Sequence, residues 1–166
     1  ERTLDNRSHL FSTSQLWNLK NDYQLKGQIN YLNDEIKAGT ASTTTYYLPE
    51  EDFTLTEIED GKAARNMLAT TLTIIGNKKS FYLNNSLNTE WRWNDTDLIT
   101  QNSEDRIREK ASLPSYKISN SFSLVKRIKQ HSLSLTSFVL WQSDPHDLGI
   151  RTNGQEQANQ AVTSNL

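Results

Sequence analysis

The stretch Ser80–Asp95, SFYLNNSLNTEWRWND, decides the fold class of this chain. Apolar and polar residues alternate in it with a period of two, which is the period of a β-strand, because successive side chains point to opposite faces. The odd positions from Phe81 to Trp93 carry most of the large apolar side chains, and the even positions are polar or carry a hydroxyl. The alternation runs for roughly fourteen residues, whereas a typical strand has about five or six. We therefore predict a long, two-faced strand that ends in two tryptophans on one side.

The same period recurs in five other segments. The six predicted strands lie near residues 8–20, 22–34, 65–76, 80–94, 114–128 and 131–142. Each has about ten to fourteen residues, at least the length that a tilted strand needs to cross a bilayer.

Short and long connections alternate along the chain. Turn-forming residues lie near Asn21–Asp22, at Gly76–Lys79 and around 128–131. Long polar segments cover residues 35–64, 95–112 and 143–166, and we expect them to be loops. Tight turns at one end and long loops at the other are typical of outer-membrane barrels. The predicted fold is all-β: an antiparallel up-and-down meander of about six long strands, with residues 1–166 forming one segment of a transmembrane β-barrel.

The composition narrows the function. Only 34% of the residues are hydrophobic and the mean hydropathy is -0.74, but four Trp, six Tyr and five Phe are placed periodically, which disfavours disorder. The net charge of -2 offers no general attraction for nucleic acid, so we expect no nucleic-acid partner. The absence of cysteine excludes disulfides, thiolate zinc sites and cysteine nucleophiles.

If the tight turns mark the periplasmic side, every strand has a direction and every aromatic ring has a height. All four tryptophans then fall near a strand end, where amphipathic rings prefer the headgroup level. The predicted aromatic girdle consists of Trp17, Tyr23, Tyr31, Trp91, Trp93, Tyr116 and Trp141. The alternative is that these rings cap the ends of a soluble core. Asn85 and Asn120 fit the membrane interpretation poorly, because they lie mid-strand on the apolar face, and Thr89 and Ser137 are milder exceptions.

The opposite face would line the barrel interior. Its candidate contacts to a solute or a plug are Lys26, Tyr82, Glu90, Arg92 and Lys117. The alternative, which the general polarity of barrel interiors favours, is a hydrated wall without a specific ligand.

Four phrases resemble barrel segments of large TonB-dependent-receptor-like outer-membrane proteins of the Bacteroidota: YQLKGQINYLNDE, FYLNNSLNTEWRW, LPSYKISNSFSLVKR and HSLSLTSFVLWQSDPHDLGI. The resemblance covers roughly residues 10 to 150. It implies a bacterial outer-membrane location and the uptake of a bulky nutrient ligand, with this chain supplying wall and outer loops. It also implies as partners the membrane lipid, the remainder of a barrel of about twenty-two strands and its plug, a surface lipoprotein and an energy-transducing periplasmic protein.

Candidate chemistry is sparse. The one hint of a metal or acid–base cluster is His131 and His146 with the nearby Asp144 and Asp147. The segment SDPHDLG, residues 143–149, is more typical of a turn, because of its Asp-Pro and Asp-Leu-Gly steps. No nucleophile elbow, phosphate loop or HExxH motif occurs in the sequence. We therefore expect no enzyme activity, no metal site and no cofactor.

Two other architectures compete with the membrane segment. One is a soluble extracellular β-sandwich, an adhesin or carbohydrate-binding module with Trp91, Trp93 and Trp141 as its platform. A weaker one is a small closed barrel that acts as a scaffold. A sandwich requires Leu25, Ile29, Leu83, Leu87, Ile118 and Phe122 to pack into a two-sheet core. A membrane segment requires them to form an exposed band on one curved sheet.

Overall fold

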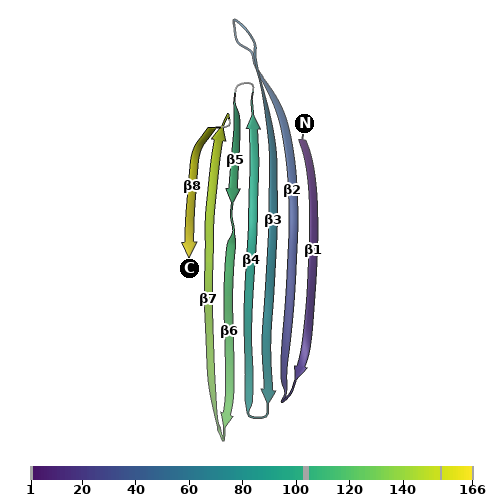
Figure 1. Ribbon diagram of the computed structural model, residues 1–166, viewed down its shortest axis with the longest axis vertical. Coiled ribbons are helices and arrows are strands. Elements are labelled where there is room, and N and C mark those ends of the chain that lie inside the picture. The colour runs from purple at the N-terminus through teal and green to yellow at the C-terminus, as the bar shows by residue number, and fades with distance from the viewer. Residues whose placement is uncertain (1, 103–104, 154, 166) are drawn as a thin grey trace.

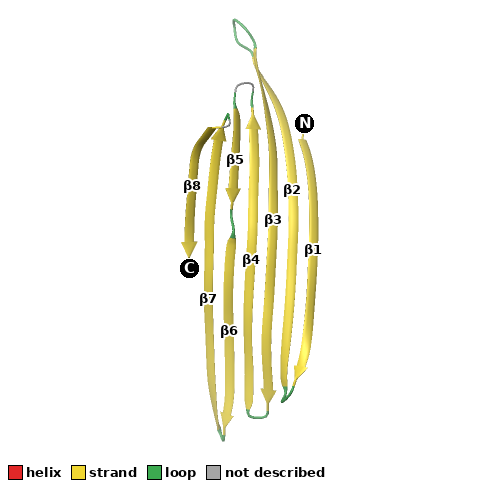
Figure 2. Cartoon of the chain, viewed as in Figure 1, coloured by secondary structure: helices red, strands yellow, loops and turns green. Residues whose placement is uncertain are grey.

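The computed structural model of the chain is one antiparallel β-sheet (Figures 1 and 2). It describes residues 2–102, 105–153 and 155–165, with side chains up to residue 155. Among these residues there is no helix long and apolar enough to cross a membrane. The strands are β1 (Arg2–Leu19), β2 (Tyr23–Tyr46), β3 (Phe53–Lys78), β4 (Phe81–Gln101), β5 (Arg106–Ser112), β6 (Ser115–Ile128), β7 (His131–Thr152) and β8 (Gln155–Asn165).

The strands follow one another across the sheet in chain order, except that β5 and β6 share one place. β4 pairs with β5 towards one end and with β6 towards the other, and β7 flanks both of them on their other side. β8 pairs with residues 143–152 of β7, and residues 147–152 of these also pair with β5. The predicted all-β up-and-down meander is therefore confirmed.

Two prolines explain the interruption between β5 and β6. The flanking pairs Ser112–Asp147 and Tyr116–Ser143 share one register, which places Pro114 opposite Pro145. The amide of the preceding residue, Leu113, donates to the Asn94 carbonyl of β4 at 2.7 Å, so residue 114 points the other way, towards β7. Because neither proline has an N–H group, both ladder hydrogen bonds of this pair are absent.

Tight turns close the sheet at one end, which we call the turn end. Asn21 and Asp22 have φ angles of 63° and 62°, a left-handed conformation that these two residue types tolerate better than most. Lys129, between β6 and β7, has a φ of 56°. The three turns join β1 to β2, β3 to β4 and β6 to β7, as the sequence predicted.

The three turns are staggered (Figure 1). Tyr23 lies opposite Gly76, and β3 continues two residues further, to Lys78, before it turns. Phe81 lies opposite Lys126, and β6 also continues two residues further, to Ile128. A stagger of one residue per strand corresponds to a strand tilt of about 35°, from about 3.3 Å of rise and 4.8 Å of strand spacing, within the range that barrels adopt.

The three segments predicted as long loops are mostly strand, so that prediction was wrong. β2 and β3 form a hairpin that extends to Tyr46 and Phe53, whose rings stack with centroids 6.1 Å apart. β5 lies within residues 95–112, and β7 continues to Thr152 and is followed by β8. These segments are polar on both faces, so they carry no apolar alternation to identify them. The SDPHDLG segment is likewise strand rather than turn.

No side chain forms a buried core among the described residues. Leu133, on the apolar face of β7, is 60% exposed, and Leu87, in the middle of the sheet, is 37% exposed. The described chain contains one sheet and no second sheet packed against it. The two-sheet sandwich is therefore not the architecture of this segment.

Candidate functional site

The register divides the sheet into two chemically different faces. Directly opposed residues share a face, so Leu25, Ile74 and Phe122 lie on the same side, linked through Asn85. This side, which we call the apolar face, includes Trp17, Leu25, Ile29, Leu68, Leu72, Ile74, Leu83, Leu87, Ile118, Phe122, Leu124, Leu135 and Val139. The other side, the polar face, is dominated by Ser, Thr, Asn and Gln. Its apolar exceptions include Leu10, Leu16, Leu32, Met67, Ile75, Val125, Phe138 and Leu140.

The predicted girdle aromatics all lie on the apolar face. Tyr31, Trp91 and Tyr116 fall in one row across the sheet, because each lies opposite the next through directly paired residues. Trp93 lies one row further from the turn end, opposite Asn66. Trp141 lies one row nearer to it, opposite Ile118. We call these three neighbouring rows the aromatic rows.

Trp17 and Tyr23 lie near the turn end of the same face. Tyr23 packs edge-to-face against Phe81, with ring centroids 6.2 Å apart, and the Lys78 ammonium lies 5.0 Å from the Tyr23 ring centroid. Gly76 makes room for this ring, since a Cβ there would lie 2.5 Å from Cε1 of Tyr23. The close approach therefore requires glycine.

Thr89 and Asn120, two of the residues that fit the membrane interpretation poorly, have partners. The hydroxyl groups of Thr70 and Thr89 lie 2.7 Å apart and form a hydrogen bond across β3 and β4. The Asn120 amide donates to the Ser86 carbonyl at 3.5 Å, a long hydrogen bond. Asn85 lies between Ile74 and Phe122 in the register, and its side chain has no hydrogen bond to any residue that the structure describes.

On the polar face, the structure brings together three of the five predicted interior contacts. Glu90 lies opposite Lys117, and its carboxylate forms an ion pair with the Arg92 guanidinium, with a nitrogen–oxygen distance of 2.7 Å. Lys26 lies apart from them on β2, opposite Leu16, and Tyr82 lies near the turn end, opposite Val125.

β7 adds two members that the sequence analysis missed. Gln142 lies opposite Lys117, and its amide donates to the Asp144 carboxylate at 2.7 Å. Hydrogen bonds from Ser115 and from Gln142 lower the pKa of Asp144, and the charges of His146 and Arg92 add to the effect. We call Glu90, Arg92, Lys117, Gln142 and Asp144 the polar cluster. Gln142 shares the parity of the polar face within the predicted strand 131–142, which was the signal that could have identified it. Asp144 lies beyond residue 142, where a loop was expected.

A small cavity of about 260 Å³ adjoins this cluster on β3, β4 and β6. Its lining includes Thr71, Asn88, Glu90, Lys117 and Ser119. The Thr71 hydroxyl donates to the Asn88 amide oxygen at 2.9 Å. The cavity thus offers hydrogen-bond donors and acceptors together with one charge of each sign. Across the described residues, no three His, Cys, Asp or Glu side chains are grouped so that they could hold a metal ion.

Comparison with known proteins identifies the fold. The chain aligns with the ferric yersiniabactin uptake receptor FyuA from Yersinia pestis, with a TM-score of 0.56 and 7% sequence identity. The alignment covers 98% of this chain and 24% of the receptor chain, so this chain spans about a quarter of the receptor's length. What the two share is the fold.

Two other structural alignments are too weak to indicate a shared fold. A lipovitellin structure aligns over 97% of this chain and 24% of its own at a TM-score of 0.28, with 7% identity. The translocator domain of the autotransporter NalP from Neisseria meningitidis aligns over 98% and 72% at a TM-score of 0.20, with 9% identity. No family model and no curated protein sequence matches the chain. The barrel-like fold is therefore established, and the relationship to Bacteroidota proteins stays a prediction.

Proposed function

We propose that this chain forms part of the wall of a bacterial outer-membrane β-barrel, in a receptor or transporter that takes up a bulky nutrient ligand. The apolar face meets lipid and the polar face lines the interior. The observation that carries this proposal is the height of the apolar band between the turn end and the aromatic rows.

That height matches a membrane. Trp91 follows Phe81, the first residue of β4, by ten residues, and Trp141 follows His131, the first residue of β7, also by ten. Ten residues at about 3.3 Å each, tilted by about 35°, rise about 27 Å, and the apolar band of an outer-membrane barrel is about 25 Å tall. A soluble sheet has no reason to end its apolar face at this height on two strands.

The unpaired edges support a larger barrel. β1 pairs only with β2, and residues 131–142 of β7 pair only with β6, so both sides of the described sheet end in free backbone groups at membrane height. Lipid cannot satisfy such groups, so further strands must continue the sheet at both sides. These strands, a plug, a surface lipoprotein and an energy-transducing periplasmic protein are the partners we propose.

The polar face supports passage rather than catalysis. Within the apolar band its groups are mainly hydroxyls and amides that pair across strands, such as Thr73 with Ser86 and Ser12 with Asn30. The polar cluster lies beside the aromatic rows, where the interior opens outwards. We propose that Glu90, Arg92 and Lys117 contact the ligand or the plug there, whereas Lys26 and Tyr82 line the wall nearer the turn end.

Single-cysteine labelling tests the two faces on the cysteine-free background. Leu87 and Asn88 are adjacent and equally deep but point to opposite faces. In the vesicle-reconstituted protein, we expect Asn88→Cys to react with a membrane-impermeant maleimide through the aqueous interior, and Leu87→Cys to be protected by lipid. Thr43→Cys, beyond the aromatic rows, is the positive control. Equal reactivity at 87 and 88, or recovery of the protein from cells in buffer without detergent, would overturn the proposal.

A further inference from the structure

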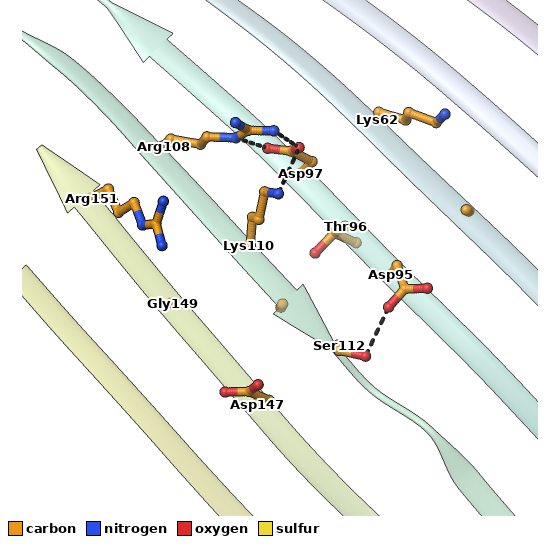
Figure 3. Close-up of a pocket in the computed structure, with 12 residues that line it drawn as sticks. Lys62, Asp95, Thr96, Asp97, Arg108, Lys110, Ser112, Asp147, Gly149 and Arg151 are labelled. Carbon is orange, nitrogen blue, oxygen red and sulfur yellow. Dashed lines mark hydrogen bonds and ion pairs between the residues drawn. The ribbon is translucent and has the colours of Figure 1, made fainter. Parts of the chain in front are cut away.

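A charged groove of about 620 Å³ lies on the apolar face beyond the aromatic rows (Figure 3). It runs over β3, β4, β5 and β7, and its charged lining comprises Lys62, Asp95, Asp97, Arg108, Lys110, Asp147 and Arg151. Gly149 borders open space in the groove, since a Cβ added at that position would meet no atom within 4 Å. The polar cluster of the proposed interior lies on the opposite face, so this groove is a separate feature.

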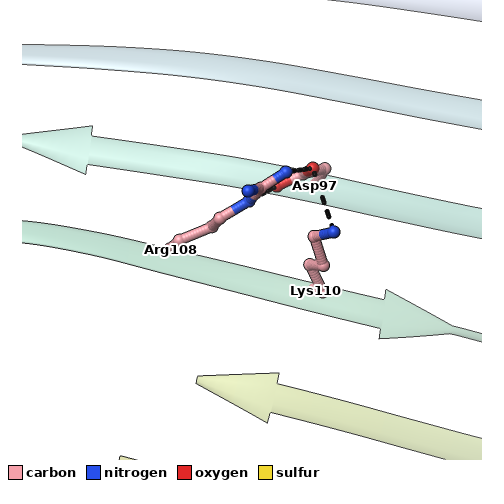
Figure 4. A network of polar contacts seen from close by, with 3 residues as sticks. All are labelled: Asp97, Arg108 and Lys110. Carbon is pink, nitrogen blue, oxygen red and sulfur yellow. Dashed lines mark hydrogen bonds and ion pairs between the residues drawn. The ribbon is translucent and has the colours of Figure 1, made fainter. Parts of the chain in front are cut away.

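One ion-pair network dominates the groove (Figure 4). Arg108 clamps Asp97 with two hydrogen bonds, in which Nε donates to Oδ1 at 2.8 Å and the terminal nitrogen donates to Oδ2. The Lys110 ammonium lies 3.9 Å from the same carboxylate. The Asp97 carboxylate therefore interacts with two cations at once.

A third cation has no partner in this network. Arg151 of β7 lies directly opposite Arg108 of β5, on the same face of the sheet. Like charges in directly opposed positions normally destabilise a sheet. Arg151 makes no ion pair or side-chain hydrogen bond with the side chains that the structure describes. Arg151 thus lies beside a network in which Arg108 and Lys110 already share the Asp97 carboxylate.

We propose that Arg108, Lys110 and Arg151 form a binding site for a phosphate group. A tetrahedral oxyanion between the two guanidinium groups would turn their mutual repulsion into two charge-assisted contacts, and arginine's fork of donors suits phosphate oxygens. Lys110 contributes a third charge from the next position along the face of β5. Asp97 holds Arg108 in place, and no described side chain pairs with the neighbouring Arg151.

The height of the groove bears on the source of the phosphate, and this step rests on the proposed membrane orientation. Asp97 lies six residues beyond Trp91, which corresponds to about 16 Å at the inferred tilt. The headgroup layer of a phospholipid leaflet extends only roughly 5–8 Å beyond the hydrocarbon. The phosphate is therefore one carried on a glycolipid's sugar or one free in solution.

The test is a titration of the purified protein in detergent micelles with two probes, inorganic phosphate and a glycolipid that bears a phosphorylated sugar. Removing one charge-assisted contact with Arg151→Gln should weaken binding about tenfold. Gly149→Leu should weaken it similarly by filling the groove without removing a charge. Arg65→Gln, which removes an exposed arginine from the polar face, is the matched control and should leave the affinity unchanged.

Glu156 lies opposite Arg151 in the backbone register of β8 and supplies a second control. Because it removes one negative charge from the strand beside Arg151, Glu156→Gln should leave phosphate binding equal or make it tighter. Tighter binding of the glycolipid than of inorganic phosphate would identify a lipid-borne source, and equal binding would identify the free anion.

The site is overturned if neither probe binds, if Arg151→Gln has no more effect than Arg65→Gln, or if Glu156→Gln weakens binding. The measurement needs no bilayer. Its failure therefore leaves the barrel proposal intact, and failure of the cysteine-labelling experiment leaves the site intact.

Discussion

At the scale of single residues, the apolar face tolerates polar side chains where a neighbouring strand supplies a partner. Thr89 satisfies its hydroxyl with Thr70, and Asn120 reaches the Ser86 backbone. Asn85 differs, because its cross-strand neighbours are Ile74 and Phe122. An unsatisfied amide in an apolar medium costs free energy, so this position is a cost to the fold if it faces lipid.

We expect Asn85→Leu to raise the free energy of unfolding by about 1–2 kcal/mol, because it removes the cost of placing an amide in lipid. Asn120→Leu is the control and should gain less, because it also removes the hydrogen bond to Ser86. Denaturant unfolding of the protein in phospholipid vesicles measures both changes. A loss of stability in Asn85→Leu would mean that its amide contacts another protein surface.

Protonation of Asp97 should lower the stability of the outer part of the sheet. The hydrogen bonds from Arg108 lower its pKa, with smaller contributions from the charges of Arg108, Lys110 and Lys62. Since the folded-state pKa lies below the unfolded-state value, this carboxylate stabilises the fold above pH of about 4. The stabilisation is lost as the pH falls through the folded-state pKa.

Asp97→Asn should therefore flatten the decline of stability below about pH 4, as measured by thermal unfolding across pH. At pH 7 the loss of stability should stay below about 1 kcal/mol, because the ion pair is partly exposed to solvent. Asp95→Asn, on the same strand and face, is the control. An unchanged pH profile in Asp97→Asn would contradict the assignment.

At the scale of elements, the strands reach far beyond the aromatic rows. β2 continues for fifteen residues after Tyr31, and its hairpin with β3 projects furthest in Figure 1. Backbone ladders and cross-strand pairs hold this region, including Lys62 with Glu35 at 3.2 Å and Thr45 with Thr54 at 3.2 Å. Pairing with a neighbouring strand is sufficient to keep this region in the β conformation, without an apolar face.

The facing prolines make the level of the aromatic rows a weak point between β7 and its neighbours β5 and β6. Pro114→Thr should restore an N–H group that can donate to the Pro145 carbonyl and join β5 and β6 into one strand. We expect a gain of about 1 kcal/mol in stability and slower amide exchange at residues 112–116, measured by hydrogen exchange. Pro49→Thr, in the turn between β2 and β3, is the control and should not change exchange there. Faster exchange in Pro114→Thr would show that the interruption itself stabilises the packing.

At the scale of the whole molecule, the described chain is an open sheet without a core. Its apolar side chains cover one face, and the stagger of the turns is that of a tilted, closing sheet. In the proposed orientation, lipid covers that face and further strands pair with the edges of the sheet. We therefore propose that stability be measured on the protein in a membrane environment.

The sequence by itself determined which residues share a face within the apolar band. The odd positions of Ser80–Asp95 and their counterparts on the other strands lie on one side, because an apolar environment on one face imposes a period of two. It also determined the tight turns, because Asn, Asp and Gly accept the backbone conformations that turns need. Glu90, Arg92 and Lys117 could be assigned to the opposite face on the same grounds.

Only the tertiary structure decided what happens beyond the aromatic rows. Both faces carry mainly polar side chains there, so no apolar pattern distinguishes strand from loop, and the pairing partner alone sets the conformation. This is why β5, β8 and the outer half of β7 were missed, and with them Asp144 in the polar cluster. The placement of Arg108 opposite Arg151 depends on the register between β5 and β7. That register cannot be predicted from these segments, because they carry no local apolar pattern.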